Sequence, residues 1–166
     1  LGTPEAQAIV PKVVEKIEGW SGKVLYTRDT HHESYLETLE GKHLPVKHCL
    51  QGTWGWQLVD EVDATISNDV WCEDNSIYNK YTFGAFRLAK DLNNLAFCPD
   101  VKITSVTLIG LCTDICVISN AMLLKAALPS VPIIVDASCC AGVTPESHKN
   151  ALAAMKMCQI EIVNEE

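Results

Sequence analysis

The chain has 166 residues, of which 48% are hydrophobic and 20% are charged, and its formal net charge is −8 at pH 7. This length and composition predict one globular domain with a substantial core. No run of Lys or Arg is present and no apolar stretch approaches the roughly 20 residues that cross a bilayer, which argues against nucleic acid and membrane partners.

The first segment predicts an amphipathic helix from Thr3 to Glu18, because apolar residues recur at intervals of three and four and Pro4 follows a threonine suited to cap a helix. The opening letters LGTPEAQ lack the basic and apolar regions of a secretory signal, so we expect a cytoplasmic protein. The eight cysteines are expected to be reduced thiols, since several lie inside apolar segments.

A short β-leaning run from Lys23 to Thr27 is followed by metal-ligand side chains. Asp29 and His31 are spaced so that both can leave the strand end on the same side. The polar stretch that follows, interpreted as a long loop, supplies Glu40 and then His48. Two imidazoles and two carboxylates suit a divalent ion such as zinc, manganese or iron. Solvated loop histidines are also common, so the spacing alone leaves both interpretations open.

The segment NKYTFGAF places Lys80 just before a helix predicted over residues 82–95. A lysine in such a place is normally solvated. If this loop folds back over a sheet edge, the ammonium would lie beside a thiol, lower the thiol pKa and stabilise developing negative charge. Phe83 and its aromatic neighbours either wall a pocket or pack in ordinary ways.

The segment VTLIGLCTDICV predicts a buried strand, Val106 to Leu111, that turns into a helix over about 114–128. Thr113 or Asp114 can cap that helix, which leaves Cys116 in its first turn. Unpaired amides and the helix dipole would lower the thiol pKa from about 8.5, and the same amides can receive an oxyanion. The pattern therefore indicates a nucleophile, although a small buried residue at a strand-to-helix corner fits this segment equally well.

The remaining segments predict a strand Ile133 to Val135, a helix from Thr144 or Pro145 to about Met157, and a strand Ile160 to Val163. Strands that alternate with helices indicate an α/β fold. We predict a three-layer sandwich with a mostly parallel, Rossmann-like sheet and helices on both faces. Ligands of such folds gather at the carboxyl ends of the strands, where Cys116 would stand.

Five segments together resemble the cysteine hydrolase family of nicotinamidases and isochorismatases, over nearly the whole chain. They are TRDTH at 27–31, EGKHLPVKHCLQGTWGW at 40–56, KYTFGAF at 80–86, GLCTDICV at 110–117 and DASCCAGVTPESH at 136–148. The segment GLCTDICV resembles the family's nucleophile turn. The set Asp29, His31, Glu40 and His48 resembles the metal site of the nicotinamidase branch, which isochorismatase members generally lack.

By this resemblance, Cys116 is the nucleophile and Lys80 the lysine of the catalytic triad. A cis peptide is expected between Leu111 and Cys112, and the N–H groups of Cys112 and Cys116 are expected to form the oxyanion hole. Leu111 and Phe83 are expected to contact the substrate. The implied activity is hydrolysis of nicotinamide to nicotinate and ammonia through a thioester, a step of NAD salvage. The resemblance also implies a divalent metal, with zinc expected before manganese or iron, and a homo-oligomer.

The sequence departs from the family's pattern at two points. The triad aspartate of the family ends a first strand, in a DxQxDF pattern, whereas LGTPEAQ resembles the segment after that strand. We expect the complete polypeptide to carry this strand and aspartate; without them the general base is missing and activity should collapse. Pro45 stands three residues before His48, where nicotinamidases can carry an aromatic that stacks on the pyridine.

Two alternative functions remain open on the sequence. One is a metal-independent cysteine hydrolase that acts on another small amide or ureido compound. The other is a relative that binds a small molecule or a protein without turning it over.

Overall fold

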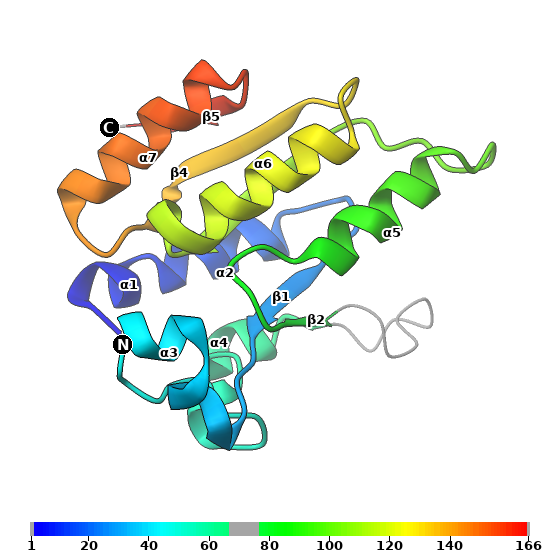
Figure 1. Ribbon diagram of the computed structural model, residues 1–166. Helices are drawn as coiled ribbons and strands as arrows, with labels where there is room; N and C mark the ends of the chain where they lie inside the picture. The colour runs from blue at the N-terminus through cyan, green and yellow to red at the C-terminus, as the bar shows by residue number, and fades with distance from the viewer. Residues whose placement is uncertain (1, 67–76, 166) are drawn as a thin grey trace.

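The computed structural model describes residues 2–66 and 77–165 and has the predicted α/β class, with parallel strands alternating with helices (Figure 1). The strands are β1 (Tyr26–Asp29), β2 (Ile77–Lys80), β3 (Val106–Leu111), β4 (Ile133–Ala141) and β5 (Glu161–Val163). The helices are α1 (Pro4–Ala8), α2 (Val10–Glu18), α3 (Leu39–His43), α4 (Asp60–Asp63), α5 (Phe86–Ala96), α6 (Ile118–Ala127) and α7 (Pro145–Met157). Short helical turns form η1 (Glu33–Glu37), η2 (Trp54–Trp56) and η3 (Thr113–Val117).

The strands form two parallel hydrogen-bonded groups, β1–β2 and β3–β4–β5. Among the described residues, β1 and β3 therefore each have a strand partner on one side only. The apolar strand β3 was expected to be buried, yet none of its residues is fully buried. An unpaired edge leaves a row of backbone N–H and C=O groups available to a further strand.

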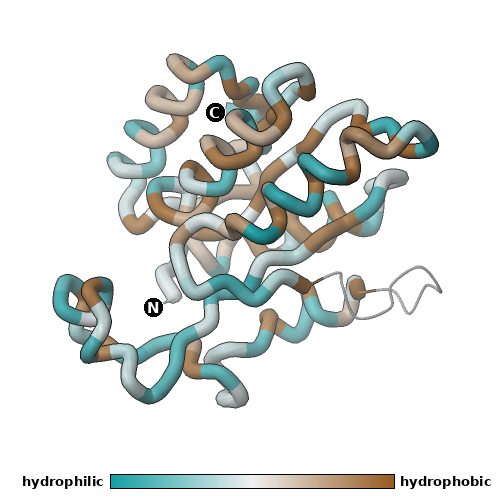
Figure 2. The backbone as a smooth tube through the Cα atoms, turned by 45° about the vertical axis from the view of Figure 1, so that its right-hand side comes forward, coloured by the Kyte–Doolittle hydropathy of each residue, from teal (hydrophilic) through white to brown (hydrophobic). Residues whose placement is uncertain are grey.

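Helices cover both faces of the β3–β5 sheet, as consecutive residues of β4 demonstrate. Val135 is fully buried in a cluster with Leu124 of α6 and Met155 of α7. Asp136, the next residue, accepts a hydrogen bond from Lys16 Nζ of α2 at 2.9 Å. Because successive side chains of a strand point to opposite faces, α2 lies across the sheet from α6 and α7. Figure 1 shows α5 and α6 side by side, and Figure 2 shows hydrophilic and hydrophobic residues interspersed along the helices.

β4 continues to Ala141, beyond the predicted end at Val135, because its last residues pair with Gly110 and Leu111 of β3, and it includes the buried carboxylate of Asp136. Burial alone would raise the Asp136 pKa, but hydrogen bonds from Lys16, Asn164 and Ser138 outweigh it and hold that pKa below the ordinary 3.8. An aspartate that receives three hydrogen bonds is compatible with the interior of a sheet.

Three further predicted elements differ from the structure. The helix expected over Thr3 to Glu18 is split into α1 and α2, because Pro11 has no N–H to donate to the carbonyl of Gln7. The strand expected at Lys23 to Thr27 is displaced toward its carboxyl end and includes Asp29. The helix expected over residues 82–95 begins later, at Phe86.

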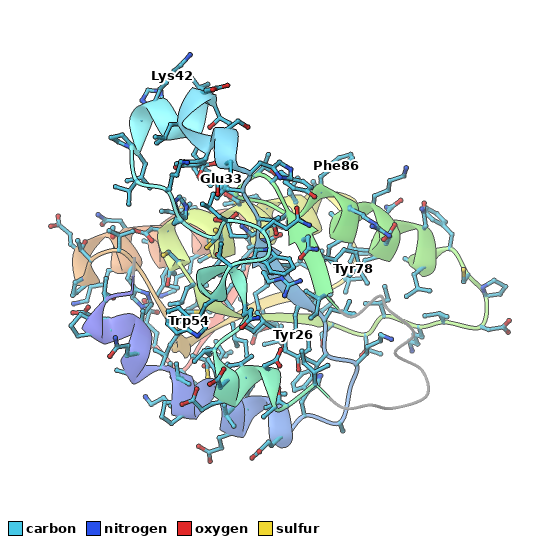
Figure 3. All side chains as sticks on the ribbon, turned by 90° about the horizontal axis from the view of Figure 1, so that it is seen from below. Tyr26, Glu33, Lys42, Trp54, Tyr78 and Phe86 are labelled. Carbon is cyan, nitrogen blue, oxygen red and sulfur yellow. The ribbon has the colours of Figure 1, made fainter. Side chains whose placement is uncertain are left out.

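Part of the stretch interpreted as a long loop is helical and forms a projecting lobe, in which Figure 3 labels Glu33 and Lys42. Tyr35 of η1 is only 1% exposed and donates its hydroxyl hydrogen bond to the carbonyl of Leu44 at 3.0 Å. Thr38 caps α3 by accepting from the Gly41 N–H at 3.0 Å. These bonds give the segment a defined shape ahead of His48. Within the described parts of the chain, no helix has the length and apolar character needed to span a membrane.

Candidate active site

The site residues come from the carboxyl ends of three strands. Asp29 ends β1 and lies opposite Lys80, which ends β2. The turn that follows β3, residues 112–117, carries Cys116 and is called the nucleophile turn below. Lys80 was treated as a loop residue from the sequence; its place in a strand explains how its side chain comes to be buried, with 5% of the residue exposed.

The nucleophile turn starts with a cis peptide between Leu111 and Cys112, as the family resemblance implied. Gly110, just before it, has a φ of 115°, a region that favours glycine. The turn is a π-helical segment rather than the first turn of an α-helix, and the Cys112 carbonyl accepts from the Val117 N–H at 3.0 Å. The regular helix α6 begins only at Ile118.

The prediction that Thr113 or Asp114 caps the following helix is wrong. The Thr113 hydroxyl, fully buried, lies 2.8 Å from Nδ1 of His148 in α7. The Asp114 carboxylate accepts from the Val143 N–H at 3.1 Å and 3.2 Å. Both side chains therefore connect the nucleophile turn to the segment after β4, and a local sequence pattern contains no signal for such long-range partners.

The Lys80 ammonium lies between the Cys116 thiol and the Asp29 carboxylate. Its Nζ lies 3.4 Å from Cys116 Sγ and 3.1 Å from Asp29 Oδ1, and it also donates to the Thr82 carbonyl at 3.3 Å. The structure thus brings together Cys116 and Lys80, which are far apart in sequence and were predicted to act together. The ammonium has no acceptor capacity, so its part is to stabilise negative charge on its neighbours.

The expected low thiol pKa of Cys116 is not found. Burial raises the pKa of Cys116, and the charge of Lys80 opposes that effect without overcoming it. Burial likewise raises the pKa of Cys112, to about 11. The sequence argument considered the amides and the helix dipole but had no measure of how much water the surrounding residues exclude.

Asp29, His31 and His48 form a group whose ligand atoms all lie within 4.8 Å of one another. Pairing of the backbone creates this group: the His31 N–H donates to the Cys49 carbonyl, and the Gln51 N–H donates to the His31 carbonyl, each at 2.9 Å. This short parallel bridge holds the segment containing His48 against the end of β1.

The donor set fits a divalent metal ion. His31 Nε2 is buried without a hydrogen-bond partner among the described residues, 3.3 Å from Asp29 Oδ2. His48 Nδ1 lies 2.8 Å from the Val46 carbonyl, so its Nε2 is left to face Asp29 Oδ2 at 3.7 Å. Two imidazole nitrogens that converge on one carboxylate, one of them oriented by a backbone carbonyl, are typical of zinc and related ions.

Glu40 lies at the margin of this group. Its Oε1 is 3.6 Å from His31 Nε2, but its ligand atom is not part of the three-residue group around Asp29. The two residues expected to contact substrate, Leu111 and Phe83, are 45% and 46% exposed. Their substrate contacts stay predictions.

The sequence prediction missed Asn120, a buried amide in α6. It is 5% exposed and hydrogen-bonds the carbonyl of Cys116 at 2.8 Å. Its one sequence signal is an amide within the apolar helical stretch ISNAMLL.

The sequence matches the Isochorismatase domain family over residues 1–166. The chain belongs to this family. Among solved structures, the chain is similar to the pyrazinamidase of Pyrococcus horikoshii in complex with zinc, with 26% identity and a TM-score of 0.78, over 99% of this chain and 89% of that one. No curated protein matches the sequence.

Two further structures share the fold. The pyrazinamidase/nicotinamidase of Streptococcus mutans is 24% identical with a TM-score of 0.76, over 96% of this chain and 87% of that one. The nicotinamidase of Bacillus subtilis is 24% identical with a TM-score of 0.70, over 94% and 82%. The predicted isochorismatase-like family is confirmed, and structures described as nicotinamidases or pyrazinamidases are among its neighbours, in line with the predicted branch.

Proposed function

We propose that this isochorismatase-family enzyme hydrolyses nicotinamide to nicotinate and ammonia through a thioester on Cys116, with a bound divalent metal ion, zinc first among the candidates. One observation carries the proposal: Asp29 belongs both to the thiol site and to the metal-ligand group. Its carboxylate accepts from Lys80, whose Nζ lies 3.4 Å from Cys116 Sγ, and it also lies beside His31 and His48. The similarity to a zinc-containing pyrazinamidase supports both the chemistry and the ion.

The covalent chemistry belongs to the nucleophile turn. The Cys116 sulfur attacks the carboxamide carbon, and the backbone N–H groups of Cys112 and Cys116 receive the oxygen that becomes negative. The C–N bond breaks as nitrogen gains a proton and leaves as ammonia; water then attacks the thioester and releases nicotinate and the thiol. Lys80 stabilises negative charge on the sulfur.

A base must take the thiol proton at the moment of attack, because burial holds the Cys116 pKa above its ordinary value. We assign this task to an aspartate at the end of a further parallel strand, as the family resemblance implies. Among the described residues, β1 and β3 each have one edge without a strand partner, which supports a position for that strand between them. The carboxyl ends of β1 and β3 lead to Asp29 and to Cys116, and Lys80 contacts both residues. The same aspartate would pass the proton to the departing ammonia.

Asp29, His31 and His48 would hold the metal ion, with Glu40 at the margin of the group, 3.6 Å from His31 Nε2. When bound, the ion would supply a Lewis-acid site for the pyridine ring nitrogen and so orient the carboxamide. Leu111 and Phe83, both exposed, would contact the ring.

The experiment is ammonia release from nicotinamide by the purified protein, before and after treatment with a chelator and after addition of Zn²⁺, Mn²⁺ or Fe²⁺. The proposal expects turnover that the chelator removes and one of the ions restores. Turnover that survives complete loss of metal would reject the metal part. Inertness toward nicotinamide, with release of ammonia from another small amide or a ureido compound, would reject the substrate.

We further propose that the enzyme works in the cytoplasm in NAD salvage and self-associates, as its family resemblance implies. Light scattering coupled to size-exclusion chromatography tests the association; a single monomeric species at assay concentration would reject it.

A further inference from the structure

Asn120 hydrogen-bonds two segments that are distant in sequence. Its Nδ2 donates to the carbonyl of Cys116 at 2.8 Å, and its Oδ1 accepts from the N–H of Ala85 at 2.8 Å. The two partners fix the orientation of the amide, because a carbonyl needs the NH₂ group and an N–H needs the oxygen. Both Asn120 and Ala85 are buried, at 5% and 4% exposure, so water does not replace these bonds.

Ala85 belongs to the loop that carries Lys80 away from β2. At the start of this loop, residues 81–85, Lys80 Nζ donates to the Thr82 carbonyl at 3.3 Å. The Thr82 hydroxyl donates to the Gly84 carbonyl at 2.8 Å. The loop also packs tightly on α6, since a Cβ at Gly84 would lie 2.4 Å from Leu123 Cδ1. Lys80 therefore holds one end of the loop and Asn120 the other.

A polar side chain with a purely local role would hydrogen-bond only the carbonyl four residues back in the chain. Ser119 offers that comparison one residue earlier: among the described residues, its hydroxyl hydrogen-bonds only the carbonyl of Ile115, four residues back, at 2.6 Å. Asn120 makes the equivalent bond to Cys116 and adds the bond to Ala85. Within the described parts of the chain, only the Asn120 side chain hydrogen-bonds both the backbone of Cys116 and the loop that follows Lys80.

We propose that Asn120 is a positioning residue that holds the loop 81–85 against the nucleophile turn and thereby fixes the approach of Lys80 to Cys116. The inference rests on the proposed function for its catalytic consequence but not for its geometry. Without the two hydrogen bonds of Asn120, the loop can shift relative to the nucleophile turn. The 3.4 Å distance between Lys80 Nζ and Cys116 Sγ is then less firmly fixed. The thiol would then lose part of the stabilisation of its ionised form.

The test compares Asn120→Leu, which removes both bonds at similar volume, with Ser119→Ala as the matched control. The rate of carboxamidomethylation of Cys116 by iodoacetamide is followed at neutral pH by mass spectrometry, which resolves Cys116 from Cys112 by fragment ions. We expect a rate at least about threefold lower in Asn120→Leu, because only part of the Lys80 stabilisation is lost, and within about twofold of the parent in the control. In ammonia release from nicotinamide, kcat should fall by a similar factor while KM changes little.

Each outcome is decisive. Equal alkylation rates in Asn120→Leu and the parent would overturn the inference, and so would an equal loss in Ser119→Ala. If alkylation of Cys116 is slower in Asn120→Leu but the parent protein never releases ammonia from nicotinamide, the inference is upheld and the proposed function is rejected. If Asn120→Leu does not fold, hydrogen exchange of the Ala85 amide in the parent protein decides: strong protection is expected, and exchange at the rate of an unstructured peptide would overturn the bridge.

Discussion

Replacing Lys80 by Met removes the one cation that contacts the Cys116 thiol among the described residues. The thiol pKa, already raised by burial, should rise further, because the charge of Lys80 is the main influence that lowers it. At a fixed neutral pH the reactive thiolate then becomes scarcer, and alkylation of Cys116 slows in proportion.

The size of the effect follows from the 3.4 Å separation of Nζ and Sγ. Two unit charges at that distance interact by about 1.2 kcal/mol in bulk water and by about 5 kcal/mol at an effective dielectric constant near 20. These limits correspond to a loss of reactivity between about eightfold and a few thousandfold. The 5% exposure of Lys80 favours the larger value, and the opposing charge of Asp29 reduces it.

The assay is the pH dependence of iodoacetamide alkylation at Cys116, in the parent and in Lys80→Met. The midpoint should move to higher pH in the variant, and the rate at neutral pH should fall by at least eightfold, roughly the lower limit above. Lys47→Met is the control, because Lys47 is an exposed lysine paired at 2.7 Å with Glu33. A rate within about twofold of the parent for Lys80→Met would refute the electrostatic reasoning.

Three other predictions test the site and the fold. Cys116→Ala should abolish ammonia release with an unchanged circular dichroism spectrum; residual turnover near the parental rate would remove Cys116 from the chemistry. His48→Ala should lower bound metal, measured by elemental analysis after dialysis, far more than Glu40→Gln, because Glu40 lies outside the three-ligand group; equal losses would make Glu40 a full ligand. Asp136 has a pKa held below 3.8, so its contribution to the free energy of unfolding is complete above that pH and is lost as the pH falls through the lower folded-state value. Urea unfolding of Asp136→Asn should therefore show lower stability at neutral pH and a weaker loss in acid than the parent, and parallel curves would contradict this account.

Elements with strong local signals were predicted with their correct bounds. The strand Val106 to Leu111 is a continuous apolar run, and α7 starts at a threonine followed by proline, where Thr144 caps the helix by accepting from the Ser147 N–H. Both signals lie within a few residues of the element they define. The identity of Cys116 and Lys80 as site residues came from the resemblance, together with the turn around the cysteine.

What could not be predicted depends on partners far along the chain. β2 was missed because IYNK has no apolar pattern of its own and becomes a strand by pairing with β1. The partners of Thr113 and Asp114 lie about thirty residues away, so capping was the nearest local interpretation. The water excluded around Cys116, which sets its pKa, is likewise a property of the assembled fold.

The two oxygens of Asp29 face different tasks: Oδ1 meets the ammonium of Lys80, and Oδ2 meets His31 and His48. Replacing Asp29 would therefore disturb both halves of the centre at once, because the lysine would lose its anion and the two imidazoles would lose the carboxylate that they share.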